Sequence, residues 1–183
     1  MRNQIRINDD GRLVVLDYES FLAYHGGGAF TGAAIGFRAM DCAGTALSRG
    51  ELWDRKELSV TTPHSGPGVR DAIEFVTRCV TRGRFRVDEG IERTSPCASH
   101  RAFQFTVSDG RQQVQIALRS AVLAEEFFDA VRRSTESQGS DQLRDELAAL
   151  KKAAAAKVIA VPMAELFTLQ IQVLQEKAMS EHA

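Results

Sequence analysis

Residues 24–36 read YHGGGAFTGAAIG, and this glycine-rich stretch decides how the start of the fold is interpreted. Three consecutive glycines are typical of a tight turn with positive φ angles, and the residues after them predict a helix over 31–48. Glycines recur every four residues in this stretch, at positions 28, 32 and 36. They share one helical face, where the missing side chains let another backbone approach closely. We interpret this face as tight packing in the core.

Composition places the chain among ordinary globular proteins. It has 183 residues, of which 44% are hydrophobic and 26% are charged, so one domain with a buried core is expected. Its 23 Lys and Arg residues nearly balance its 24 Asp and Glu residues, and the net charge of -1 provides no field that would attract nucleic acid. No apolar run reaches the roughly 18 residues of a membrane span, and residues 1–10 lack the apolar core of a signal peptide. We expect a cytoplasmic protein that binds neither nucleic acid nor membranes.

The order of the predicted elements indicates an α+β fold. The predicted strands fall at residues 12–16, 57–62, 84–88, 101–108 and 112–119. Asp109-Gly110, between the last two strands, is the strongest hairpin signal in the chain. An amphipathic helix is predicted over 69–81, and Asp17 is a candidate cap for a short helix that ends near Tyr24. We interpret residues 89–100 as a loop.

The composition changes after Ser120, where helix-forming residues become frequent. Helices are predicted over 122–133, 141–158 and 162–177. Pro162 suits the first turn of the last of these helices. We therefore divide the chain into a core of residues 1–120 and a helical extension of residues 121–183. The apolar stripes of the extension must be buried, so it is expected to pack on the core or on a second copy in a homodimer.

Two glycine-rich loops precede predicted helices, and each loop contains a histidine. The first loop holds His25, and the second, residues 62–68, holds His64. Helix N-termini offer free N–H groups and the positive end of the helix dipole, which bind phosphate or carboxylate groups. The alternative is a tight connection whose φ angles only glycine adopts easily. The candidate ligand-binding residues are Gly26, Gly27, Gly28, Thr31, Ser65, Gly66, Gly68 and Arg70.

Histidine and cysteine side chains provide candidates for a metal or acid–base site. Cys42, Cys79 and Cys97 form no C-x-x-C pair, which argues against a disulfide framework or a four-cysteine zinc ribbon. Neutral imidazole and thiolate are ligands that zinc prefers, so His25, His64 and Cys79 are candidate metal ligands and candidate catalytic groups. The alternatives are surface histidines and a core cysteine, because helical spacing places Cys79 on or beside a buried face.

Familiar hydrolase and nucleotide-binding motifs are absent. The His-Gly-Gly-Gly run at 25–28 is similar to an esterase oxyanion loop, but that chemistry also needs a G-x-S-x-G elbow, which the chain lacks. The chain also lacks the G-x-G-x-x-G spacing and the Gly-Lys-Ser/Thr run of the common nucleotide-binding loops.

Two segments resemble motifs of FmdE, a family of formylmethanofuran dehydrogenase subunits. His25-Gly26 followed by TGAAIGFR at 31–38 is similar to the family's opening motif, in which His-Gly-His and Cys-Pro-Gly precede a helix that ends in Gly-aromatic-Arg. GVRDAIE at 68–74 and TRCVTRG at 77–83 are similar to the family's Cys-Gly-Val-Asp-Ala-Ile-Gln and Thr-Gly-Cys-Thr-x-Gly runs. The resemblance covers roughly residues 18–120.

This resemblance implies a mixed β-sheet of about four to five strands flanked by helices, and homodimers are common in the family. It also implies an association with molybdenum or tungsten formylmethanofuran dehydrogenase systems and a site for zinc or another divalent metal. Of the family's metal ligands, His25 and Cys79 are retained, and His64 lies near the position of a lost cysteine. Phe30 stands where the family has its first cysteine, and Pro67 stands at about the next one. The C-terminal zinc finger of some members is absent.

Three functions remain open from the sequence. The first is FmdE-like handling of a metal ion or a small anionic ligand, as an enzyme or an accessory factor, in a cleft formed by the His25 loop, the His64 loop and Cys79. The second is a metal-free module that binds an anionic small molecule. The third is a structural, homodimeric accessory subunit. The first two depend on the two glycine loops meeting in one hollow, and the sequence leaves open whether Cys97 and His100 reach it.

Overall fold

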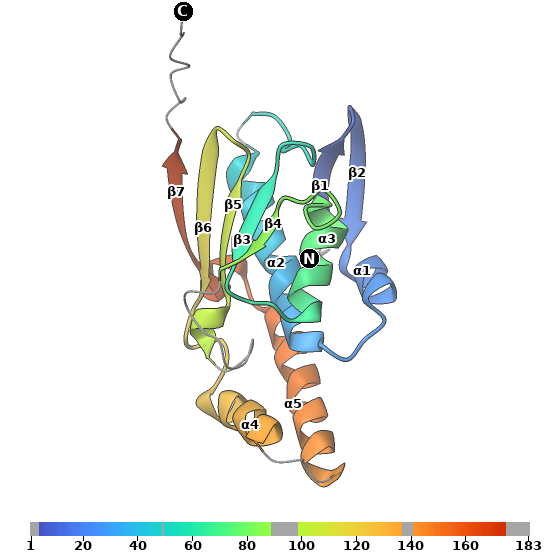
Figure 1. Ribbon diagram of the computed structural model, residues 1–183, viewed down its shortest axis with the longest axis vertical. Helices are drawn as coiled ribbons and strands as arrows, with labels where there is room; N and C mark the ends of the chain where they lie inside the picture. The colour runs from blue at the N-terminus through green and yellow to red at the C-terminus, as the bar shows by residue number, and fades with distance from the viewer. Residues whose placement is uncertain (1–3, 49, 89–98, 137–140, 175–183) are drawn as a thin grey trace, which may run out of the picture.

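The computed structural model confirms an α+β fold, in which helices flank a five-stranded mixed sheet (Figure 1). The structure describes residues 4–48, 50–88, 99–136 and 141–174. Cys97 and most of the loop predicted at 89–100 lie outside these residues. Within the described part of the chain, no helix has the length and apolar composition needed to cross a membrane.

The main sheet is mixed, as the sequence predicted. In spatial order its strands are β4 (Phe85–Val87), β3 (Ser59–Thr62), β5 (Gln104–Ser108), β6 (Gln112–Leu118) and β7 (Phe167–Val173). β3 and β4 run parallel, whereas every other neighbouring pair is antiparallel. Parallel neighbours need a crossover connection, and α3 (Pro67–Thr77) supplies it between β3 and β4.

One face of this sheet packs against α2 (Phe30–Leu47) to form the core. Side chains along a strand point alternately to opposite faces, so every second residue of β5 and β6 reaches that face. Phe105, Val107, Val114 and Ile116 are all at most 1% exposed there. The intervening residues of both strands are mostly Thr and Gln, which gives the opposite face its polar character.

Two predicted local structures are confirmed. Gly110 adopts a φ of 86° in the turn between β5 and β6, as the Asp-Gly signal requires. Asp17 caps α1 (Tyr18–His25), because its Oδ1 accepts a hydrogen bond from Ser20 N at 2.7 Å.

A two-stranded sheet at the N-terminus was only half predicted. β2 (Arg12–Asp17) was expected, but β1 (Gln4–Asp9) was not. The polar residues of β1 conceal its pattern, in which only Ile5 and Ile7 are buried, at 2% and 0% exposure. Gly11 adopts a φ of 75° in the turn between the strands.

The helices α2 and α3 pack closely where the sequence predicted tight glycine packing. A Cβ added at Gly36 would lie 2.9 Å from the Ala72 Cβ and 3.2 Å from the Val69 Cα, so a larger residue would separate the helices. α3 ends at Thr77 rather than at residue 81 as predicted. The reason is Arg78, whose φ of 60° is left-handed and stops the helix.

The C-terminal third contributes helices and one strand. A 3₁₀ turn, His100–Ala102, precedes β5, and the later helices are α4 (Glu125–Glu136), α5 (Asp141–Ala160) and α6 (Met163–Leu166). The prediction of a last helix over 162–177 is wrong, because α6 ends at Leu166 and β7 follows. β7 pairs with β6 along its whole length, from Phe167 opposite Leu118 to Val173 opposite Gln112. Its sequence, FTLQIQV, alternates as a strand does, and the paired strand lies far away in the sequence.

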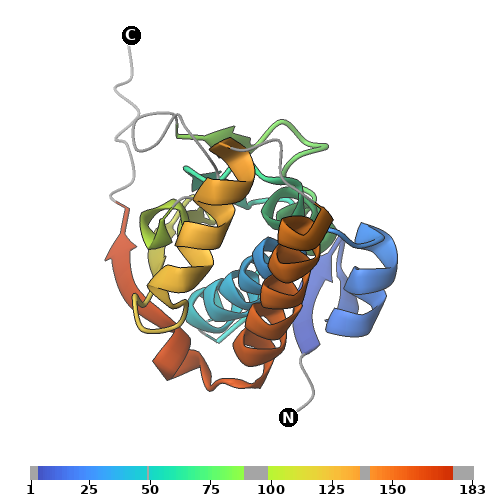
Figure 2. The ribbon, with the colours of Figure 1, turned by 90° about the horizontal axis from the view of Figure 1, so that it is seen from below.

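α4 and α5 lie side by side across the helical layer, with α5 packed on α2 (Figure 2). The Thr31 hydroxyl donates a hydrogen bond to the Lys151 carbonyl oxygen at 3.0 Å, which ties the start of α2 to α5. Both glycine loops also lie at this end of the molecule (Figure 1).

Candidate functional site

A cavity of about 510 Å³ lies where the two glycine loops meet α4 and α5. Its wall contains both predicted histidines, the starts of two helices, and apolar side chains from α4. The lining residues are His25, Gly27, Gly28, Ala29, Thr31, Gly32, His64, Gly66, Pro67, Gly68, Asp71, Phe127, Val131 and Lys151.

The first glycine loop turns the chain from α1 into α2 within four residues. Gly26, Gly27 and Gly28 have φ angles of 75°, 103° and 97°, which side chains with a Cβ rarely adopt. Gly26 also closes α1, since its N–H donates to the Leu22 carbonyl oxygen at 3.0 Å. This sequence of conformations holds His25 beside the first residues of α2.

Two helix N-termini meet at the cavity, and neither is capped by a side chain. The N-cap residues are Ala29 for α2 and Gly66 for α3. A Cβ added at Gly68 would lie 2.5 Å from the Ala29 carbonyl oxygen and 2.6 Å from the Ala33 nitrogen, so the two helix starts touch through their backbones. The first N–H groups of a helix have no acceptor within that helix, and they carry its positive dipole end.

Gly32 leaves space beside one of these N–H groups. A Cβ added at Gly32 would lie 3.6 Å from the Val69 nitrogen, 3.5 Å from a Val69 methyl and 3.7 Å from the His64 Cε1. These are ordinary contact distances, so an alanine would fit without strain. It would nevertheless occupy space between the starts of α2 and α3, because Val69 lies in the first turn of α3.

His25 forms a buried pair with Asp71 of α3. The His25 Nδ1 lies 2.7 Å from the Asp71 Oδ2, and the His25 side chain is 3% exposed whereas that of Asp71 is 35% exposed. The Phe21 ring stacks on the imidazole with 5.9 Å between centroids. The second ring nitrogen, Nε2, is buried and has no hydrogen-bond partner among the described residues.

His64 is buried and neutral. Its side chain lies against Phe103, with ring centroids 4.8 Å apart, and the residue is 1% exposed. Its Nδ1 accepts a hydrogen bond from Gly66 N at 3.1 Å, which assigns the ring proton to Nε2. Burial lowers the pKa of His64 to about 4, because the charged form loses its hydration.

The structure does not bring Cys79 to the cavity. Cys79 follows the C-terminal end of α3, whereas the cavity lies at the N-terminal end, about 16 Å away for a helix of this length. The buried Cys79 thiol donates to the Leu58 carbonyl oxygen at 3.2 Å, and burial raises its pKa. The prediction that Cys79 forms the floor of the cleft is therefore wrong, because the whole length of α3 separates this core thiol from the cavity.

The other predicted residues divide into two groups. Five of them line the cavity: Gly27, Gly28, Thr31, Gly66 and Gly68. Ser65, Arg70 and Gly26 are exposed and do not line it. His100 lies beside Phe128 of α4, with 6.4 Å between ring centroids, and is not a lining residue either.

Sequence reasoning missed Asp71 and Lys151 as site residues. Asp71 stands 46 positions after its partner His25, so spacing alone could not pair them. Asp71 does occur in the GVRDAIE segment, which resembles the FmdE family, and this resemblance is the one sequence signal that could have identified it as a site residue. Lys151 belongs to a lysine- and alanine-rich helix whose pattern does not distinguish it from its neighbours.

The described residues do not fit the zinc site that the family resemblance implies. A zinc site needs three or four protein ligands, and within the described ranges no group of three His, Cys, Asp or Glu side chains is placed to hold a metal ion. His64 presents a protonated Nε2 and an engaged Nδ1, so its ring offers no free lone pair. Phe30 and Pro67 supply no donor atoms at the two positions where the family has cysteines.

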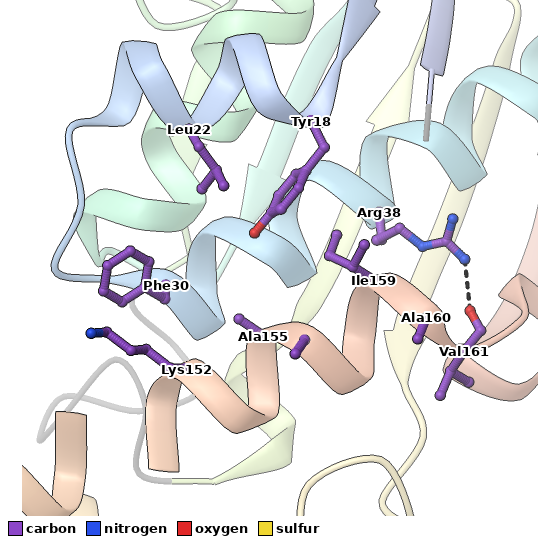
Figure 3. Close-up of a pocket in the computed structure, with 10 residues that line it drawn as sticks. Tyr18, Leu22, Phe30, Arg38, Lys152, Ala155, Ile159, Ala160 and Val161 are labelled. Atoms are coloured by element: carbon purple, nitrogen blue, oxygen red, sulfur yellow. Dashed lines mark hydrogen bonds between the residues drawn. The ribbon is translucent and has the colours of Figure 1, made fainter. Parts of the chain in front are cut away.

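A second cavity, of about 590 Å³, lies between α1, α2 and α5 (Figure 3). Tyr18 and Leu22 point into it from α1, and Ile159 points into it from α5 (Figure 3). Burial raises the pKa of the Tyr18 hydroxyl to about 12. The Lys152 ammonium lies 5.8 Å from the centre of the Phe30 ring. No histidine, cysteine or carboxylate lines this cavity, whose residues are Tyr18, Leu22, Phe30, Arg38, Lys152, Ala155, Ala156, Ile159, Ala160 and Val161.

Comparison with known proteins identifies a similar solved structure. No family model matches the chain, and no curated protein matches it. The similar structure is the crystal structure of a tungsten formylmethanofuran dehydrogenase FmdE-like protein from Syntrophus aciditrophicus. The two chains are 18% identical, the match covers 88% of this chain and 74% of the other, and the TM-score is 0.48. The family in its name is the one that residues 25–38 and 68–83 resemble.

Proposed function

We propose that this protein binds a small anionic ligand, with a carboxylate or phosphate group, in the cavity between the starts of α2 and α3. One observation carries the proposal: two helix N-termini without side-chain caps touch at the wall of a single cavity. The first turns of both helices therefore lie at the same cavity, and anions bind the free N–H groups of helix starts well. In α3 these groups belong to Gly68 and Val69, because Pro67 has no N–H.

The charges around the cavity favour an anion. Lys151 contributes one positive charge and Asp71 one negative charge, while the buried His64 is neutral. Each helix start adds about half a positive charge. When the His25 ring is uncharged, the charges of the lining groups therefore sum to about one positive charge. This charge comes from the two helix starts, whose backbone N–H groups are already in place before the ligand binds.

The buried His25 is a second, independent indication of a ligand. A buried ring nitrogen without a hydrogen-bond partner costs roughly 1–3 kcal/mol. The hydrogen bond that links α1 to α3 uses only the other ring nitrogen, Nδ1, so burial of Nε2 adds nothing to this link. A ligand seated in the cavity would supply the missing partner.

A metal-handling function is the alternative that the family resemblance suggests. A histidine whose one nitrogen bonds to a carboxylate is the usual arrangement around a metal-bound imidazole, and His25 has it. The structure supports metal binding less well than anion binding, because His25 and Asp71 have no third metal ligand near them among the described residues.

Calorimetric titration of the full chain with acetate and with inorganic phosphate at low ionic strength tests the proposal. The adjacent lysines of α5 provide a matched pair of variants, because Lys151 lines this cavity and Lys152 lines the second one. Both Lys151→Met and Lys152→Met remove one positive charge and keep an aliphatic stem. We expect Lys151→Met to weaken anion binding about fivefold, the equivalent of about 1 kcal/mol, and Lys152→Met to change it less than twofold.

Two results would contradict the proposal. One is that neither acetate nor phosphate gives binding heat, and the other is that Lys151→Met and Lys152→Met lose the same amount of anion affinity. A parallel titration with zinc measures the alternative, and tight zinc binding that is lost in His25→Phe would favour it over the anion.

A further inference from the structure

We infer that the ligand carries a hydroxyl group next to its anionic group, as a small hydroxycarboxylate does, and that the His25 Nε2 accepts the hydrogen bond from this hydroxyl. The inference rests on the proposed function, because the anionic group is what places the ligand in the cavity. It adds the chemical class of the ligand and assigns a selecting role to the pair of His25 and Asp71.

The tautomer of His25 follows from its partner. An ionised carboxylate only accepts hydrogen bonds, and the Asp71 Oδ2 lies 2.7 Å from the His25 Nδ1. In the uncharged form of the ring the proton is therefore on Nδ1, and Nε2 carries a lone pair. A carboxylate or a fully ionised phosphate has only acceptor atoms, so it leaves this lone pair without a partner.

The position of His25 is fixed on three sides. The Phe21 ring stacks on its face, Asp71 bonds to one nitrogen, and the glycine turn after α1 sets its backbone. A side chain held this firmly does not turn away to satisfy Nε2 in solvent. The described residues supply no donor to Nε2, and His25 lines the cavity, so we assign the missing donor to the occupant of the cavity.

The two parts of the site therefore require two groups on one small molecule. The helix starts of α2 and α3 require a negative charge, and His25 requires a donor. Glycolate supplies both groups, and acetate supplies only the first at the same net charge. Because acetate leaves a buried acceptor without a donor, glycolate should bind about tenfold more tightly than acetate, the equivalent of about 1.4 kcal/mol.

Titration of the full chain with glycolate and with acetate, at one pH and ionic strength, tests this inference. We expect about a tenfold preference for glycolate in the native chain. In His25→Phe the ring still stacks on Phe21 but offers no acceptor, so the two anions should bind within about twofold of each other. In Asp71→Asn the cavity gains positive charge while the tautomer is no longer fixed, so acetate should bind more tightly and the preference for glycolate should fall.

The outcomes separate the inference from the function on which it rests. If acetate binds but glycolate binds no better, the inference is overturned and anion binding stands. If neither acetate nor glycolate binds the native chain, the inference is overturned, and if inorganic phosphate does not bind either, anion binding is overturned too. If His25→Phe remains folded by circular dichroism and keeps the tenfold preference for glycolate, the ligand hydroxyl does not bond to His25 and the inference is wrong.

Discussion

The two cavities that α2 and α5 help to line have similar sizes but very different walls. The first, at the glycine loops, has about 510 Å³ and contains two helix starts, two histidines and a carboxylate. The second has about 590 Å³ and is lined mainly by the alkyl and aromatic side chains of α1, α2 and α5. Consecutive lysines of α5 face them, Lys151 the first and Lys152 the second. The difference teaches that backbone N–H groups and a fixed histidine, rather than volume, mark the candidate site.

The largest expected effect is a pH dependence that belongs to the first cavity. The pKa of His64 is lowered by burial to about 4, below the ordinary 6.5 of an unfolded chain. Between pH 6.5 and about 4 the unfolded chain therefore binds a proton that the folded chain does not, so stability falls as the pH falls. The loss from this group is roughly 3 kcal/mol and ends below about pH 4.

Urea unfolding from pH 7.5 to pH 4 measures this effect, with His64→Gln as the control for the other titrating groups. The difference in unfolding free energy between the two chains should shrink by roughly 3 kcal/mol over this range. Parallel pH profiles for the two chains would show that His64 is not buried as described.

A smaller effect is expected from the contact between the two helix starts. In Gly68→Ala the new methyl would overlap backbone atoms of Ala29 and Ala33, so the helices must separate, at a cost of about 1–3 kcal/mol. Gly32→Ala is the matched control at the same wall, because its methyl meets only ordinary contacts. Denaturant titration should show a loss for Gly68→Ala and no loss for Gly32→Ala, and equal stabilities would refute the close approach.

Removing a hydroxyl at the first cavity should cost more stability than removing one at the second cavity. Thr31→Val removes the hydroxyl that donates to the Lys151 carbonyl oxygen at the first cavity, at a cost of about 1 kcal/mol. Tyr18→Phe removes a hydroxyl at the second cavity, and we expect a change within about 0.5 kcal/mol. Thermal unfolding of both variants checks this order, and the reverse order would contradict it.

The smallest effect is expected at Cys79. Its thiol donates to the Leu58 carbonyl oxygen in the core, a bond that a serine hydroxyl also makes, and it lies a full helix length from the cavity. Cys79→Ser should therefore leave acetate affinity within about twofold of the native value. A tenfold or greater loss of acetate affinity in Cys79→Ser would show that Cys79 belongs to the binding site.

The parts of the fold that were predictable depend on local sequence. Asp109-Gly110 specifies its hairpin and Asp17 caps its helix through neighbouring residues only, so a single sequence suffices to recognise them. β7 was predicted as a helix, because its strand conformation depends on pairing with β6, whose residues lie far away in the sequence.

The candidate site divides in the same way. The histidine-bearing glycine loops were visible in the sequence, and both line one cavity. The pairing of His25 with Asp71 was not visible, because α1 and α3 must pack before the two side chains meet. The placement of Cys79 failed because the cavity forms at the start of α3, whereas Cys79 follows the end of that helix.

The most direct test of the account is a calorimetric titration of acetate into the native chain and into Gly32→Ala. Gly32 lines the cavity, and the added methyl would occupy space between the two helix starts, beside Val69 and His64, without straining the fold. Alanine also suits a helix better than glycine by up to about 1 kcal/mol. We predict that Gly32→Ala is at least as stable as the native chain and binds acetate at least fivefold more weakly. Equal acetate affinity in the two chains would contradict the claim that the converging helix starts bind the anion.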